Sequence, residues 1–236
     1  MTTVVWFKRD LRTRDHGPLT AAAALGEPVI PLYVVEDDYW QLPDTSGRQW
    51  AFVRQSLEDL NRQLRQLGSG LTIGRGDVLD TLKALHEKHT LKRVFCHQET
   101  GGRWTFDRDL AVIRWCEDNG ITFQEWRQFG VVRRLKDRDT WDKAWTEVMR
   151  QPVLAAPEKL PAPDNTRAFE LPDLDLSDTC LDPQSGGSAR GEKLLASFLD
   201  RRCVGYQYNI SSPLTAVRAC SRLSPHIAYG TVSVSP

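Results

Sequence analysis

The sequence predicts a doubly wound α/β domain built on a five-stranded parallel sheet, followed by a linker and further helices. Over roughly the first 130 residues, apolar runs of strand length alternate with amphipathic helical patterns, as in parallel sheets covered on both faces. Six of the 13 prolines then fall between residues 152 and 183, which is typical of a linker lying on a domain surface. A helical pattern resumes after Gly186 and Gly187, over residues 192–202.

The first elements follow from local patterns. A short apolar strand is expected at residues 4–7, and an Ala-rich helix with Pro18 near its start at residues 15–26. The next strand covers residues 29–35. The strongest helical pattern covers residues 49–67, where apolar residues recur at spacings of three and four and so share one face. These residues are Trp50, Val53, Leu57, Leu60, Leu64 and Leu67. Gly68 follows at the expected C′ position.

The remaining elements continue the alternation of strands and helices. Asp77 is expected to cap a helix that runs to about residue 85, and Gly120 to end another over residues 106–119. One further helix is expected at residues 141–149. The three remaining strands are expected at residues 71–73, 93–96 and 121–126.

The charge balance is neutral overall and uneven along the chain. Lys and Arg number 31 against 31 Asp and Glu, so no global field attracts nucleic acid. Residues 183–236 carry six basic and two acidic side chains, as an anionic ligand or DNA would favour. A solvated helix face accounts for the same excess, and charge alone favours that explanation.

Cysteine usage and hydropathy predict the compartment. The five cysteines are scattered and contain no C-x-x-C pair, which argues against a zinc site or a disulfide scaffold and indicates a reducing cytosol. No signal peptide precedes the first strand, and no apolar run reaches the roughly 18 residues of a membrane span. We expect a soluble, cytoplasmic protein that does not bind membranes and holds no metal.

The turn after the first strand is charged. Residues 8–12 read Lys-Arg-Asp-Leu-Arg and lie at the carboxyl end of that strand, where open α/β sheets bind ligands. They could meet a phosphate-bearing ligand or form an internal ion-pair cluster, and the residues alone favour the cluster. No G-x-G-x-x-G follows the strand, so a standard dinucleotide-binding turn is excluded.

Residues 221–224, Ser-Arg-Leu-Ser followed by Pro225, offer two hydroxyls and a run of backbone donors, which suit a phosphate. Taken alone, a helix cap explains them better. The segment nevertheless resembles the flavin-phosphate loop of the photolyase/cryptochrome family, whose usual pattern is Tyr, about eleven residues, then Thr-Ser-x-Leu-Ser, Pro and a closing Gly. Tyr208 stands at that spacing from Cys220.

Other parts of the chain agree with this resemblance. Residues 4–12 and Asp15 are similar to the family's amino-terminal Trp-Phe-Arg-Arg-Asp-Leu-Arg strand and turn. Further matches, in family order, are Glu99, Thr100, Gly101, Arg108, Asp109, Trp115, Gly186, Gly187, Leu195 and Phe198. The resemblance therefore covers nearly the whole chain.

The resemblance implies a Rossmann-like photolyase amino-terminal domain at residues 1–130. A helix and a Pro/Asp-rich interdomain linker follow at residues 131–185, and residues 186–236 begin an all-α FAD-binding domain that is incomplete. It also implies FAD as cofactor, bound by Tyr208, Cys220, Ser221, Arg222, Leu223 and Ser224. Cys220 stands where the family usually has Thr, which removes one hydroxyl donor.

The function implied is that of a blue-light flavoprotein. A deoxyribodipyrimidine photolyase is a carbon–carbon lyase that binds damaged DNA, flips out a pyrimidine dimer and splits it by light-driven electron transfer from FAD. A cryptochrome uses the same photochemistry for signalling, and nothing before residue 236 separates the two. Family members are about twice as long, so we expect catalytic residues beyond residue 236 and a fragment that alone binds FAD weakly and repairs nothing. A non-catalytic α/β chromophore- or nucleotide-binding module is the alternative.

Many family members hold a second, antenna chromophore in or beside the first domain. Folate-binding members carry an acid four positions before the residue that matches Asp109, and Thr105 here disfavours folate. A flavin, a deazaflavin or no antenna remain open. Trp50, Trp115 and Trp145 are expected to pack among apolar neighbours, and His226 to be structural.

Overall fold

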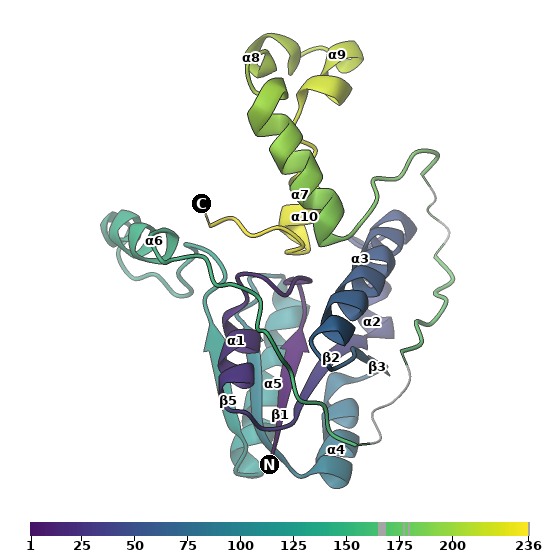
Figure 1. Ribbon diagram of the computed structural model, residues 1–236, viewed down its shortest axis with the longest axis vertical. Coiled ribbons are helices and arrows are strands. Elements are labelled where there is room, and N and C mark those ends of the chain that lie inside the picture. The colour runs from purple at the N-terminus through teal and green to yellow at the C-terminus, as the bar shows by residue number, and fades with distance from the viewer. Residues whose placement is uncertain (165–168, 177, 179, 236) are drawn as a thin grey trace.

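The computed structural model describes residues 1–164, 169–176, 178 and 180–235. Its described residues form one parallel sheet in the order β3-β2-β1-β4-β5 (Figure 1). The strands are β1 (Thr2–Phe7), β2 (Val29–Val35), β3 (Thr72–Arg75), β4 (Leu91–His97) and β5 (Thr122–Trp126). The predicted doubly wound α/β fold is confirmed.

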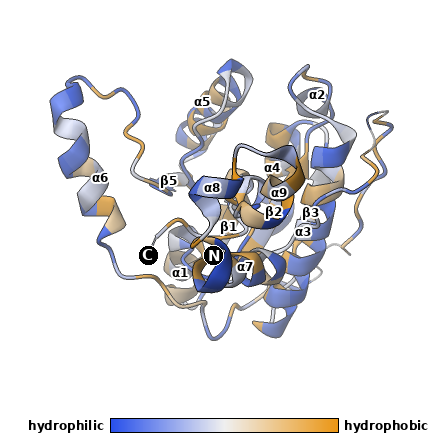
Figure 2. Ribbon diagram, turned by 90° about the horizontal axis from the view of Figure 1, so that it is seen from above, coloured by the Kyte–Doolittle hydropathy of each residue, from blue (hydrophilic) through white to orange (hydrophobic). Residues whose placement is uncertain are grey.

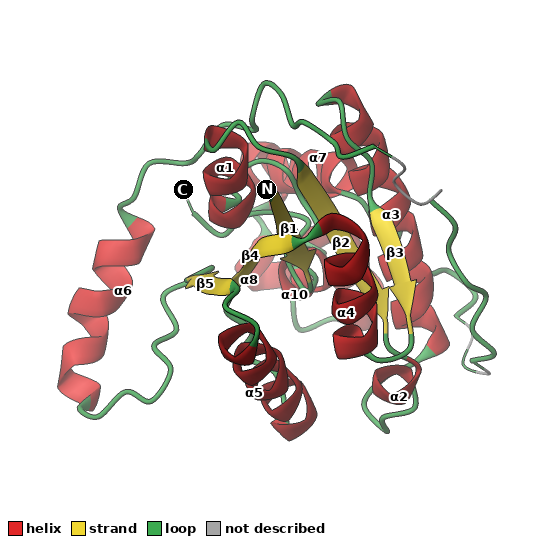
Figure 3. Cartoon of the chain, turned by 90° about the horizontal axis from the view of Figure 1, so that it is seen from below, coloured by secondary structure: helices red, strands yellow, loops and turns green. Residues whose placement is uncertain are grey.

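Both faces of the sheet are buried because successive side chains on each strand point to opposite sides. On β1, Val5 and Phe7 pack with α1 and α3, whereas Val4 and Trp6 pack with α4 and α5. Figure 3 shows these helix pairs on the two sides of the sheet. The helices are α1 (Gly17–Ala24), α2 (Asp37–Trp40), α3 (Gly47–Gln66), α4 (Val78–His89) and α5 (Arg103–Asp118).

The helix ends show where local signals are sufficient. Gly68 follows α3 with a φ of 96°, a left-handed conformation that favours glycine, and the side chain of Asp77 accepts from the N–H of Leu79, as predicted. Helix α1 begins later than expected, at Gly17. Asp15 has a φ of 51°, outside the right-handed helical region, and His16 caps the helix instead.

The segment after β5 leaves the α/β domain and returns. A 3₁₀ turn (Arg138–Thr140) leads into α6 (Trp141–Met149), which stands apart from the sheet and the other helices (Figure 2). Trp145, 40% exposed, therefore does not pack in a core, and that expectation was wrong. The linker then runs along the domain, where Leu160 is buried and its N–H donates to the carbonyl of Leu67 at 2.7 Å.

The carboxy-terminal helices rise from the carboxyl edge of the sheet. Figure 1 shows α8 and α9 at the far end of α7 and α10 at its near end. The predicted helix at residues 192–202 begins earlier, at Ser188, because Asp59 of α3 accepts from the N–H of Ser188 at 2.9 Å. The elements are α7 (Ser188–Ser197), a π-helical turn (Phe198–Arg202), α8 (Tyr206–Asn209), α9 (Pro213–Ala219) and α10 (Ser224–Ala228).

Among the residues that the structure describes, no helix combines the length and the apolar character that a membrane span requires.

Candidate functional site

A buried ion cluster occupies the carboxyl ends of β1, β2 and β4. Lys8 Nζ lies 2.9 Å from Asp109, and Arg108 reaches Glu36 at 2.7 Å and Glu99 at 2.5 Å. All five side chains are almost fully shielded from solvent, and their charges alternate in space. The charged turn therefore belongs to an internal cluster, the alternative that the sequence favoured.

Arg108 fills the crevice that it crosses. Its guanidinium lies over the ring of Trp6, 4.8 Å from the centroid, and faces Trp104 at 5.5 Å. Burial raises the pKa of Glu36 to about 7 although Arg108 opposes that shift. Only about 30 Å³ of cavity remains here, far below the roughly 300 Å³ from which small-molecule sites start.

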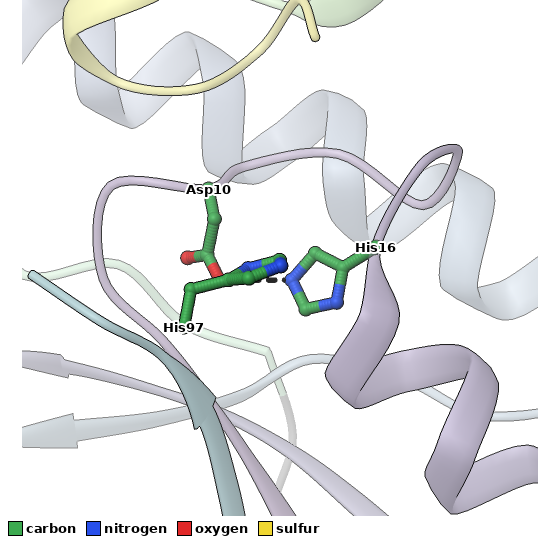
Figure 4. A group of neighbouring side chains, drawn as sticks. All are labelled: Asp10, His16 and His97. Atoms are coloured by element: carbon green, nitrogen blue, oxygen red, sulfur yellow. Dashed lines mark hydrogen bonds and ion pairs between the residues drawn. The ribbon is translucent and has the colours of Figure 1, made fainter. Parts of the chain in front are cut away.

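Beside this cluster, a buried carboxylate joins two histidines (Figure 4). Asp10 Oδ2 lies 2.9 Å from Nε2 of His16 and 2.7 Å from Nδ1 of His97, while its Oδ1 accepts from the N–H of Lys8. Burial alone would raise the pKa of Asp10, but the two histidines hold it well below its usual range. Burial lowers the pKa of His16 to about 4, so this ring is neutral at physiological pH.

These three side chains have the residue types of a metal site, but their hydrogen bonds argue against one. Nδ1 of His16 accepts from the N–H of Leu19 at 3.1 Å, which places the proton of the neutral ring on Nε2. Nε2 then donates to Asp10 and has no lone pair for a cation. The group is a hydrogen-bonded triad.

The carboxyl edge of the sheet also contacts the end of the chain. The N–H of Leu11 donates to the carbonyl of Tyr229 at 3.1 Å, and Arg12 donates to the carbonyl of Gly230 at 2.9 Å. Gly230 has a φ of 61°, and a Cβ there would stand 2.2 Å from the carbonyl oxygen of Arg9. Only glycine suits this contact, which holds the carboxy-terminal segment against the domain.

His226 lies in the same contact. It is fully buried, its Nδ1 is 2.7 Å from Oγ1 of Thr231, and its ring meets Phe52 edge-on. Burial lowers its pKa to about 4. These contacts support the structural role expected for His226.

The residues predicted to bind the flavin phosphates lie around the turn between α9 and α10. Cys220 ends α9, Ser221, Arg222 and Leu223 form the turn, and Ser224 opens α10. Arg222 has a φ of 62°, in the left-handed region, and Leu223 is right-handed. Successive residues of opposite hand turn their N–H groups toward one side, a geometry that binds anions.

Two side chains that the sequence did not indicate hold this turn from its other side. Arg202 donates to the carbonyls of Cys220 and Ser221, and Gln184 donates to the carbonyl of Arg222. The carbonyls are thus occupied, whereas the N–H groups of Ser221 and Arg222 have no partner among the described residues. The turn presents donors to whatever lies on its open side.

Tyr208 is not brought to this turn. It lies in α8, at the opposite end of α7 from α10 (Figure 1), and its side chain is 80% exposed. Neighbouring Tyr206 packs instead against Phe198, with ring centroids 5.7 Å apart. Five of the six predicted residues are consecutive in the chain and lie in or beside this turn, whereas Tyr208 lies in α8.

Comparisons with known proteins agree with these observations. The family model described as DNA photolyase matches residues 3–148. A deoxyribodipyrimidine photo-lyase of Streptomyces griseus is 28% identical over 98% of this chain and 53% of its own length. A cryptochrome DASH of Natronomonas pharaonis is 26% identical over 98% of the chain and 54% of its own length.

Solved structures extend the likeness to three dimensions. A bacterial class III photolyase from Agrobacterium tumefaciens superposes with a TM-score of 0.79 at 25% identity, over 98% of this chain and 51% of that protein. The chain thus spans about half the length of these relatives.

Proposed function

The chain belongs to the DNA photolyase family, and from this premise we propose that its parent protein is a blue-light-dependent flavoprotein that repairs pyrimidine dimers in damaged DNA. Bound FAD would supply the light-driven electron transfer that splits the dimer, while the protein binds and orients it. The observation that supports this most is the turn at residues 220–224, whose donors are free on the side away from Arg202.

The turn suits the pyrophosphate of FAD. The hydroxyls of Ser221 and Ser224 and the unpartnered N–H groups of Ser221 and Arg222 would donate to phosphate oxygens, and such charge-assisted bonds are the strong ones. Cys220 contributes no hydroxyl, so its role would be confined to the backbone. Tyr208 would join the site only if the helices around α8 rearrange or pack with further chain.

By the same proposal, residues 1–130 form the α/β domain, residues 131–185 the linker region, and residues 186–236 the beginning of the helical FAD-binding domain. The described residues cover the turn on one side only, whereas high-affinity small-molecule sites bury most of the surface of their ligand. The 236-residue chain alone would then hold FAD weakly and repair nothing.

The phosphate role can be tested in the parent protein with matched serines. Ser224→Ala is expected to weaken FAD binding about tenfold, because one charge-assisted hydrogen bond is lost. Ser211→Ala, an exposed serine before α9, serves as the control. FAD content after gel filtration measures both, and equal retention in the two variants would contradict the proposal. The proposal that the 236-residue chain alone holds FAD weakly has its own test. Stoichiometric flavin that copurifies with this chain, seen by absorbance at about 450 nm, would contradict it.

A cryptochrome-type light sensor is the first alternative, and dimer repair under blue light in the parent protein separates it from a photolyase. A non-catalytic α/β module is the second, and one observation favours it: most of the buried core on both faces of the sheet comes from residues 1–130. Limited proteolysis distinguishes this module. Cleavage confined to residues after 186, with residues 1–150 intact and stable, would support it.

For an antenna chromophore we propose the cavity of about 440 Å³ beside Trp104, since the crevice crossed by Arg108 is too small. A flavin or deazaflavin fits that volume. Thr105 is buried and donates to the carbonyl of Gly102 at 3.0 Å, so it offers no carboxylate for a folate.

A further inference from the structure

A second cavity, of about 200 Å³, lies where the strand order reverses, between the ends of β1 and β4. This switch point is where open α/β sheets hold their ligands. The cavity is lined from residues 8–10, 97–100 and 128–129, and residues 227–228 of α10 line its remaining side. Nothing in the photochemical function proposed above uses it.

His97 lines this cavity and has one ring nitrogen without a hydrogen-bond partner within the described ranges of the chain. The side chain is 5% exposed, Nδ1 is bonded to Asp10 at 2.7 Å, and Nε2 has no partner among the described residues. A neutral ring that donates from Nδ1 to a carboxylate carries its lone pair on Nε2. Asp10 is held in turn by His16, so the acceptor nitrogen of His97 is fixed in position.

The charges around the cavity cancel. Lys8 and Arg9 contribute two positive charges, and Asp10 and Glu99 contribute two negative ones. Lys8 is paired with Asp109 and Arg9 lies 3.5 Å from Glu99, so neither cation is free for an anion. Since burying an unpaired charge is costly, the cavity favours a neutral ligand.

The other walls combine polar and flat apolar groups. Gln98 and Thr100 line the cavity, and neither side chain has a partner in the described part of the chain. Phe129 and Ile227 supply apolar surface. A volume below the usual 300 Å³ or so admits one ring system rather than a dinucleotide.

We propose that this cavity binds a neutral, nucleobase-sized heterocycle whose ring N–H donates to Nε2 of His97. The amide and hydroxyl of Gln98 and Thr100 pair with the edge of the ring, while Phe129 and Ile227 contact its faces. Because Ile227 lies in α10, the helix that Ser224 opens, an occupied cavity stabilises the docked position of α10. The proposal does not depend on FAD.

The test uses the 236-residue chain, with uracil and adenine as probes and inorganic phosphate as the charged control. Nitrogen NMR of the histidine rings is expected to show the Nε2 signal of His97 shifting with either base and not with phosphate. His97→Asn is expected to weaken base binding about tenfold, the loss of one hydrogen bond to a buried acceptor. His86→Asn is the control, since His86 lies in α4 against Trp115 and neither lines the cavity nor contacts Asp10.

A second variant keeps the triad intact. Ala228→Leu adds bulk to an exposed α10 position on the cavity wall, so it is expected to abolish base binding while the ring signals of His16 and His97 stay unchanged. The proposal is overturned if neither base binds, if phosphate shifts His97 as strongly, if both histidine variants weaken binding equally, or if Ala228→Leu leaves the affinity unchanged.

Discussion

The α/β domain and the helices α8 and α9 make opposite use of apolar side chains. Leu57, Leu60 and Leu64 of α3 are fully buried between the sheet and the linker, whereas Tyr208 of α8 and Leu214 of α9 are 80% and 89% exposed. Helices α3 and α9 both carry leucine, so residue type alone does not decide which side chains are buried. The difference shows that the apolar face of α3 is covered within the described structure, whereas α8 and α9 have apolar surface that the described residues do not cover.

Between these regions, α10 shows what makes a helix part of the domain. Leu223, His226 and Tyr229 are buried against the α/β domain, and Gly230 allows the close approach to Arg9. The carboxy-terminal segment is therefore anchored at its near end and open at its far end. This agrees with the proposal that α7 to α9 begin a larger helical domain.

The largest expected effect on stability comes from the buried ion cluster of the α/β domain. Arg108→Met keeps the side chain between Trp6 and Trp104 but leaves buried Glu36 without its ion-pair partner. We expect a loss of about 3–5 kcal/mol in the free energy of unfolding, measured with urea. Arg201→Met, in a pair that is 78% and 72% exposed, is expected to change it by less than about 0.5 kcal/mol.

The loss of unfolding free energy caused by Arg108→Met should also depend on pH. Glu36 can become neutral by taking up a proton, so the loss should be smaller at about pH 5 than at about pH 8. Equal losses for Arg108→Met and Arg201→Met would show that the cluster is not buried as described.

The next largest effect is expected from truncating a buried leucine rather than an exposed one. Leu60→Ala removes a fully buried side chain from α3 and should cost about 2–5 kcal/mol of unfolding free energy, whereas Leu214→Ala should cost less than about 0.5 kcal/mol. Urea unfolding of the 236-residue chain measures both. A large loss for Leu214→Ala would mean that α9 is covered, for example by a second copy of the chain.

The smallest effect concerns His16, whose pKa falls from 6.5 to about 4 on folding. As the pH falls, the His16 ring is protonated in the unfolded chain before it is protonated in the folded one. The contribution of His16 to the free energy of unfolding is therefore fully present above pH 6.5, and about 2–3 kcal/mol of it is lost as the pH falls toward 4. Glu36 acts in the opposite sense, since its raised pKa favours the folded state at acid pH. Urea unfolding at a series of pH values should therefore show a smaller acid loss for His16→Asn than for the unmodified chain. Parallel profiles would contradict the assignment.

Features that depend on residues close together in the sequence were predicted correctly, whereas features that depend on distant residues were not. Strand β2 and helix α6 match the residues predicted, and Gly68 ends α3, because periodicity and glycine conformation act within a few residues. The start of α7 was missed because its cap acceptor, Asp59, lies 129 residues away in the sequence. Arg202 and Gln184 were missed for the same reason, since nothing local marks a side chain that binds a distant carbonyl.

The candidate sites divide in the same way. The sequence located the turn at residues 220–224 by its motif, but not the side chains that hold it. Trp6 of β1 pairs with Cys96 of β4, and this register brings Asp10 beside His97. Tyr208 was grouped with the turn by spacing alone, and the structure places it in α8 with an 80% exposed side chain.

By itself the sequence determined the fold class, the succession of strands and helices, and the family, because periodicity, caps and motifs are written in consecutive residues. Only the tertiary structure decided which polar groups satisfy one another. It showed that the charged turn closes into an ion cluster, that Asp10 joins two histidines, and that Nε2 of His97 has no partner among the described residues. Such pairings depend on distances set by sheet register and helix packing, which no local pattern encodes.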